Sequence, residues 1–182
     1  MKVVIVNGNP DPENALFEKY LSDLSGEISG RTGTESVDFT LRDMNLNYCT
    51  GCFSCWVRTP GKCIFHDDVE PVLKAMLCSD IILYCSPIIM GFTSALLKTL
   101  CDRSIPILHP YFVIDRGEVH HRARYDHYPK IGVIYQQEES ADEGEFIRKV
   151  YSRIAVNMKT ECIFAESIEK PVEEAVNELN CA

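Results

Sequence analysis

Residues 2–8, Lys-Val-Val-Ile-Val-Asn-Gly, decide the fold class of this chain. The run from Val3 to Val6 is continuously β-branched, which is typical of a strand that is buried on both faces. A loop of turn-forming residues follows it, and from Asn14 to about Leu24 apolar residues recur at helical spacing and share one face. A doubly buried strand followed by an amphipathic helix is the repeating unit of a parallel sheet that helices cover on both sides.

The rest of the chain repeats this alternation of strand and helix. Further strands are predicted at residues 36–41, 81–85, 130–135 and 162–165, and further helices are predicted to begin at Asp67-Asp68, Ser94, Glu143 and Pro171. The pattern predicts an α/β protein with a flavodoxin-like three-layer α/β/α fold and a five-stranded parallel sheet in the order 2-1-3-4-5. We expect residues 1–182 to form a single domain, because the sequence has no internal repeat and no linker.

The segment at about residues 104–129 has no helical period and stands outside this alternation. Within it, residues 111–114 and 119–122 are predicted to pair as a β-hairpin around a turn that contains Gly117. Long insertions are usually functional or lie at an interface, and the alternative is a surface flap without chemistry. The segment also carries a group of cationic or titratable side chains that either meets an anionic ligand or is a solvated hairpin edge: His109, Arg116, His120, His121, Arg122, Arg124 and His127.

The composition is that of a globular protein, with 46% hydrophobic and 25% charged residues. A formal net charge of -9 argues against a nucleic-acid-binding protein, which would need a basic surface to neutralise phosphates. The nine cysteines are an odd number, and several lie in apolar stretches, which is typical of a reducing compartment. The apolar N-terminal run is too short for a signal peptide, and no apolar stretch is long enough to span a bilayer. We therefore expect a soluble cytoplasmic protein without a membrane partner.

Four of the cysteines are concentrated between residues 49 and 63, with the spacing C-x2-C-x2-C-x7-C. Two residues between successive cysteines allow a turning backbone to aim the sulfur atoms at one centre, as an iron–sulfur cluster or a zinc ion requires. The alternatives are one disulfide with two free thiols, or four unligated thiols. The candidate metal ligands are Cys49, Cys52, Cys55 and Cys63.

Ligands of an open parallel sheet bind beyond the carboxyl ends of the strands, where the strand order reverses. Here that point lies between the first strand and the strand at 81–85, so the loops after these two strands are the candidate binding segments. The first loop opens a helix whose amide groups would suit a phosphate, or it is a tight turn in which Asn14 caps the helix. The second loop is apolar and suits the face of an aromatic ring, or it packs as core. The candidate ligand-binding residues are Gly8, Asn9, Pro10, Asn14, Ala15, Pro87, Ile88, Ile89, Met90, Gly91 and Phe92.

Three stretches of the sequence together resemble the NAD(P)H-dependent FMN reductase family of the flavodoxin-like superfamily, and within it the iron–sulfur flavoproteins. The first strand and its loop resemble the family's G-S-P-R-x-x-x-N-T phosphate loop. Residues 49–68 resemble its C-x-G-C-x-x-C…G-x-C-x-x-x-D-D segment, and residues 86–103 resemble its s-P-v-Y…s-a-x-l-K-x-f-x-D-R segment. The resemblance implies FMN, with its phosphate on the loop at 8–15 and its isoalloxazine against residues 87–92.

The same resemblance implies hydride transfer from NAD(P)H to flavin, or electron relay to flavin from a [4Fe-4S] cluster on the four cysteines. It also implies an electron acceptor that the sequence does not identify, and a homodimer or homotetramer with flavin sites near the subunit interface. The predicted function is an FMN-dependent oxidoreductase or electron-transfer flavoprotein.

A second hypothesis is a non-enzymatic binding or redox-sensing protein with a zinc or thiol site. It rests on Asp11 and Glu13, which stand where the family has Arg and polar residues, because carboxylates repel a phosphate. No residue of the sequence identifies a catalytic acid or base.

Overall fold

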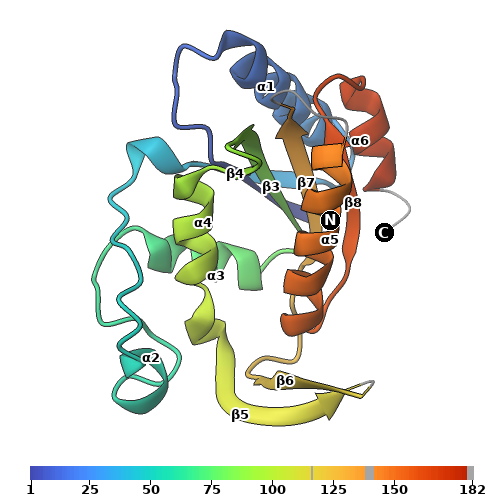
Figure 1. The fold of residues 1–182 in the computed structure, drawn as a ribbon. Helices are drawn as coiled ribbons and strands as arrows, with labels where there is room; N and C mark the ends of the chain where they lie inside the picture. Colours follow the sequence, from blue (N-terminus) through green and yellow to red (C-terminus); the bar gives the residue numbers. More distant parts are fainter. Residues whose placement is uncertain (116, 138–141, 180–182) are drawn as a thin grey trace.

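A computed structural model describes residues 1–115, 117–137 and 142–179, and it confirms the predicted fold class. Five parallel strands form the main sheet in the order β2-β1-β3-β7-β8, which is the predicted order 2-1-3-4-5 (Figure 1). Their bounds are β1 (Lys2–Asn7), β2 (Glu35–Thr40), β3 (Ile81–Ile89), β7 (Lys130–Gln136) and β8 (Cys162–Ser167). Among the described residues, no helix has both the length and the apolar character that crossing a membrane requires.

Helices cover both faces of this sheet and divide the core in two. α1 (Ala15–Ser29) and α6 (Val172–Glu178) lie side by side on one face, and α3 (Val69–Leu77), α4 (Ala95–Asp102) and α5 (Asp142–Asn157) lie on the other (Figure 1). In β1, Val3 and Ile5 pack under α1 and α6, whereas Val4 and Val6 pack under the opposite layer. The continuous β-branched run is therefore buried on both sides, as its composition predicted.

The predicted end of the third strand at Cys85 and the predicted loop at 86–93 are wrong. β3 continues to Ile89, with Ser86 and Pro87 paired to β7, and it turns at Met90-Gly91 into the antiparallel β4 (Phe92–Thr93). Both turn residues have positive φ, 55° and 76°, as a two-residue hairpin turn of this kind requires. β1 ends opposite Cys85, so the extension of β3 has a free side there and tolerates a proline.

The connections carry the remaining elements. The cysteine-containing segment between β2 and α3 holds η1 (Leu41–Asp43) and the short α2 (Ser54–Val57). The segment between α4 and β7 holds η2 (Ile105–Ile107) and an antiparallel hairpin of β5 (Leu108–Asp115) and β6 (Glu118–Ala123). Arg116, which the sequence analysis assigned to the cationic group of this segment, lies outside the described residues.

Candidate functional site

The carboxyl ends of β1, β3 and β7 bring the predicted ligand-binding segments to one edge of the sheet. The amide of Gly8 donates to the carbonyl of Cys85 at 2.7 Å, so the first loop begins directly against β3. At the other end of that loop, Asn14 Nδ2 donates to Gln136 Oε1 of β7 at 2.7 Å. The loop at 8–15 and the β3–β4 hairpin therefore adjoin the point where the strand order reverses, as the sequence predicted.

Gly8 makes a close backbone contact with helix α4. A Cβ atom at this position would lie 2.8 Å from the Cβ of Leu97 and 3.2 Å from the carbonyl oxygen of Cys85. The hydroxyl of Ser94 donates to the carbonyl of Gly8 and accepts from the amide of Leu97, which caps the start of α4. Gly8 was predicted as a ligand-binding residue, and in the structure it lets the loop approach helix α4.

The amides of the first loop are used within the chain. Asn7, Asn9 and Asp11 form a ladder of side-chain acceptors, each bound to the amide two residues further on: Asn9 N to Asn7 Oδ1 at 2.9 Å, Asp11 N to Asn9 Oδ1 at 3.1 Å and Glu13 N to Asp11 Oδ1 at 3.0 Å. The amide of Asn14 donates to the carbonyl of Asp11, and the amide of Ala15 donates to the carbonyl of Glu13. Pro10 and Pro12 have no amide hydrogen. Every backbone amide from Gly8 to Ala15 thus has an acceptor in the protein itself.

Sequence reasoning missed an ion pair beneath this loop. Glu18, in the first turn of α1, accepts from Arg42 Nη1 at 2.8 Å and from Asn9 Nδ2 at 2.6 Å. Burial alone would raise the pKa of the Glu18 carboxyl, but hydrogen bonds from Arg42, Asn9 and Asn7 outweigh it and lower the pKa. Arg42, which also donates to the carbonyl of Asn9, is therefore neutralised where it touches the loop. The acidic residue in the first turn of this helix was the feature of the sequence that could have indicated the ion pair.

These residues do not fit the phosphate of a bound FMN. A phosphate loop offers free backbone amides to the anion, and here the amides hold the protein's own oxygen atoms. The side chains of Asp11 and Glu13 are exposed at the same loop and add negative charge. Asn14 caps α1 by accepting from the amide of Phe17 at 3.3 Å, which is the structural alternative that the sequence left open.

The β3–β4 hairpin supplies an apolar surface at the same edge. Ile88 is buried and packs as core, whereas Ile89 is 41% exposed and Met90 is 93% exposed. Phe92 is half-buried, and its ring packs edge-on against Phe146 of α5 with the centroids 6.3 Å apart. This arrangement offers an apolar surface to the flat face of an aromatic ring system.

The four clustered cysteines lie around one small cavity of about 30 Å³, which Phe53, Phe65 and Ile105 also line. Burial raises the pKa of the Cys55 thiol, and the neighbouring Cys63, Cys49 and Cys52 raise it further. Hydrogen bonds from the side chain and backbone of Ser54 lower the pKa of the exposed Cys52 thiol. Their thiol chemistry and shared cavity fit a thiolate-ligated centre. Within the described residues, however, no group of three or more Cys, His, Asp or Glu side chains is arranged to hold a metal ion.

A buried ion pair holds the base of this cysteine segment. Arg103, at the end of α4, donates to both carboxylate oxygens of Asp67 at 2.8 and 2.9 Å, and both side chains are 1% exposed. Arg103 also donates to the carbonyl of Asn47, and Asp67 accepts from the amide of Asn47 at 3.0 Å. A helix was predicted to begin at Asp67-Asp68, and Asp67 does accept from the amide of Val69, the first residue of α3, at 3.3 Å. Its contacts with Asn47 and Arg103, which fix the entrance to the cysteine segment, were not predicted.

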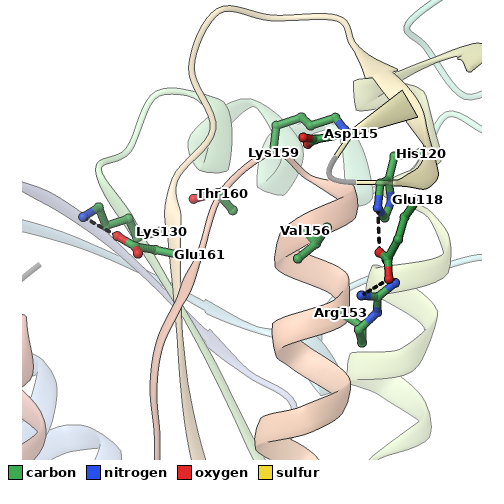
Figure 2. A pocket seen from close by; sticks show the side chains of 9 residues that line it. All are labelled: Asp115, Glu118, His120, Lys130, Arg153, Val156, Lys159, Thr160 and Glu161. Atoms are coloured by element: carbon green, nitrogen blue, oxygen red, sulfur yellow. Dashed lines mark hydrogen bonds and ion pairs between the residues drawn. The ribbon is translucent and has the colours of Figure 1, made fainter. Parts of the chain in front are cut away.

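A separate groove of about 620 Å³ lies at the opposite end of the sheet, between the β5–β6 hairpin, the end of α5 and the starts of β7 and β8 (Figure 2). Its charged side chains pair with one another: Arg153 with Glu118 at 2.7 Å, Lys130 with Glu161 at 2.6 Å and Lys159 with Asp115 at 3.5 Å. His120 lies 3.0 Å from Glu118 Oε2 and 2.9 Å from Asn157 Oδ1. These contacts fasten the hairpin to α5.

Three other members of the predicted cationic group also have partners within the protein. Arg124 donates to the carbonyls of Pro106 and Leu108, and His127 Nε2 lies 2.9 Å from the carbonyl oxygen of Ser79. The ring of His121 packs between Trp56 and Phe112. For these three residues, the contacts favour a structural role over an anion-binding one.

Comparison with known proteins finds the same family that the sequence motifs resemble. The profile of the family described as "NADPH-dependent FMN reductase" matches residues 1–122. An iron–sulfur flavoprotein of Methanocaldococcus jannaschii is 39% identical over 110 residues, 59% of this chain and 53% of that protein, and one of Archaeoglobus fulgidus is 33% identical over 104 residues, 57% and 49% of the two chains. The chain thus spans about half the length of these relatives.

The fold also matches solved structures. The crystal structure of an azoreductase from Bacillus anthracis superposes with a TM-score of 0.68 over 100% of both chains at 17% identity, which supports the fold alone.

Proposed function

Because the chain belongs to the NADPH-dependent FMN reductase family, we propose that it is an NAD(P)H-dependent flavin oxidoreductase that passes electrons from a nicotinamide nucleotide through a flavin to an acceptor outside this chain. The family match over residues 1–122 carries the proposal. The apolar β3–β4 hairpin at the carboxyl edge of the sheet supports it, since Pro87, Ile89, Met90, Gly91 and Phe92 offer a surface for the ring end of the flavin. When bound, a flavin supplies the hydride and electron transfer.

The four clustered cysteines are proposed as the ligands of a [4Fe-4S] cluster that exchanges electrons with the flavin. Cys49, Cys52, Cys55 and Cys63 line one cavity, and the two relatives at 39% and 33% identity carry the name iron–sulfur flavoprotein. The clamp between Arg103 and Asp67 would hold the base of this segment in place while the cysteines adjust to ligand geometry.

An absorption spectrum of protein purified without oxygen tests both parts. We expect NAD(P)H to bleach the visible band of FMN or riboflavin added without oxygen, and we expect a broad additional absorption that dithionite bleaches. A protein that changes the spectrum of neither flavin and does not catalyse the reduction of either is incompatible with the oxidoreductase proposal.

The cysteine assignment is tested by a matched pair of variants. The double variant Cys52→Ser, Cys55→Ser is expected to lose most of its iron, because two of four thiolate ligands are removed. The variant Cys78→Ser is the control, since Cys78 is also exposed but follows α3, outside the cysteine segment. Iron content per chain is the measurement, and equal loss from both variants would contradict the assignment.

The closed first loop favours a second candidate, a binding or thiol-sensing protein that has kept the fold without the cofactor. The observation behind it is the ladder of Asn7, Asn9 and Asp11, which uses the amides that a cofactor phosphate would need. Stoichiometric zinc in a protein without flavin affinity would favour this candidate over the oxidoreductase.

A homodimer or homotetramer is proposed as the working assembly. The β5–β6 hairpin exposes Tyr111, Phe112, Ile114 and Val119, and the stack of Phe53, Trp56, His121 and Phe112 joins it to the cysteine segment. A two-stranded hairpin with such a surface gains stability when another subunit covers it. Sedimentation velocity is expected to give at least twice the monomer mass, and the variant Ile114→Glu is expected to shift the protein towards the monomer.

A further inference from the structure

We propose that this protein selects its flavin by the lack of a phosphate, so that riboflavin, or another flavin without a phosphate group, binds at least as tightly as FMN. The inference rests on the proposed flavin oxidoreductase function and names the flavin that this site accepts. It follows from the disagreement between the family's phosphate-binding loop and the loop that this chain has.

The first argument is the hydrogen bonding of residues 8–15. A phosphate gains its affinity at a helix start from backbone amides that have no other partner. Here Asn7, Asn9 and Asp11 each accept from the amide two residues further on, and the carbonyls of Cys85, Asp11 and Glu13 accept the other amides of the loop. A phosphate would have to displace these acceptors, one of which is itself a carboxylate.

The second argument is the charge around the loop. Asp11 and Glu13 are exposed on it, and a dianion placed near either side chain would be repelled. Arg42, the cation that donates to this loop, is held by Glu18 with bonds of 2.8 and 3.1 Å. Its charge is therefore already balanced before any ligand arrives.

The third argument is that the apolar surface proposed for the flavin ring does not involve the hydrogen bonds and charges of residues 8–15. The exposed part of the β3–β4 hairpin is apolar around Ile89 and Met90. This surface would meet the flavin ring and not the ribityl phosphate. A flavin without the phosphate would still contact this apolar surface. It would displace no acceptor from the loop amides and would not be repelled by Asp11 and Glu13.

Titration of flavin fluorescence with the full-length protein tests the proposal on riboflavin and FMN side by side. We expect the Kd for riboflavin to equal or lie below the Kd for FMN, and we expect added salt to tighten FMN while leaving riboflavin unchanged, since salt screens the repulsion. FMN that binds more tightly than riboflavin would overturn this inference and leave the oxidoreductase proposal standing. Binding of neither flavin would overturn both.

Two double variants test which carboxylates weaken FMN binding relative to riboflavin binding. The variant Asp11→Ser, Glu13→Ser is expected to tighten FMN about tenfold relative to riboflavin, because two negative charges leave the loop. The control Asp23→Ser, Glu27→Ser removes two exposed carboxylates from the other end of α1 and should leave the ratio unchanged. If the ratio of the Kd for FMN to the Kd for riboflavin stays the same in the first variant, or changes equally in both variants, the assignment to Asp11 and Glu13 is overturned. The comparison of the two flavins on the wild-type protein tests the inference independently of how either variant folds.

Discussion

Replacing Arg103 with Met is expected to lower the free energy of unfolding by about 3–5 kcal/mol, the usual cost of breaking a buried ion pair by removing one partner. Arg103 and Asp67 are both 1% exposed, and the two side chains form a bidentate pair. Methionine fills much of the same volume but leaves the Asp67 carboxylate buried without its counter-charge. Chemical denaturation monitored by circular dichroism measures the change.

The variant Lys98→Met is the matched control for Arg103. Lys98 also lies on α4 and pairs with a carboxylate, that of Asp102, but both side chains of this pair are about half exposed. Exposed pairs contribute about 0–1 kcal/mol, so this variant should differ little from the wild type. Equal destabilisation by the two variants would contradict the assigned importance of the buried pair. A second readout is the rate at which the thiols of the cysteine segment react with a thiol reagent, which should rise only in the Arg103 variant.

The same pair predicts how stability depends on pH. Burial alone would raise the pKa of the Asp67 carboxyl, but hydrogen bonds from Arg103 and Asn47 outweigh it and hold the pKa well below its ordinary value of 3.8. A carboxyl whose pKa is lower in the folded than in the unfolded state stabilises the fold fully above the unfolded value. This contribution is lost as the pH falls from about 4 towards the lowered pKa. The acid limb of the stability curve should therefore flatten in the variant Asp67→Asn.

Replacing Gly8 with Ala is expected to destabilise the protein by about 1–3 kcal/mol, the typical cost of an additional methyl group in a tightly packed site. The new Cβ would lie 2.8 Å from the Cβ of Leu97, an atom fixed to the backbone of α4, and 3.2 Å from the carbonyl oxygen of Cys85. Neither neighbour can move without shifting α4 or β3. The free energy of unfolding, measured by denaturation, gives the result.

Gly26→Ala is the contrasting substitution, and its expected effect has the opposite sign. Gly26 lies inside α1, where an added Cβ meets nothing within 4 Å. Alanine there should stabilise the protein by about 0.5–1 kcal/mol, because glycine is the poorer helix former. If both substitutions changed the free energy of unfolding in the same direction, the close contact at Gly8 would not be the cause of the effect of Gly8→Ala.

The positions of the two candidate loops were predicted, whereas the hydrogen bonding of the first loop was not. The loop after β1 and the segment after Cys85 could be located from the order of strands alone, because the reversal of that order fixes where loops gather. The hydrogen bonding of the loop after β1 could not be predicted, since it depends on which amides bind the side-chain acceptors Asn7, Asn9 and Asp11. The roles of Glu18 and Arg103 depend on Arg42 and Asp67, which are 24 and 36 residues distant in the sequence.

The fold class, the strand order and the family could be predicted from the residues alone, because hydrophobic periodicity and motif spacing are properties of neighbouring residues in the chain. Which polar groups are available to a ligand becomes visible only in the folded chain. Hydrogen bonds and ion pairs form between residues that are distant in the chain, and whether an amide or a guanidinium is free depends on all its neighbours in space. For this reason a loop that resembles a phosphate site in its position proved to hold the protein's own oxygen atoms.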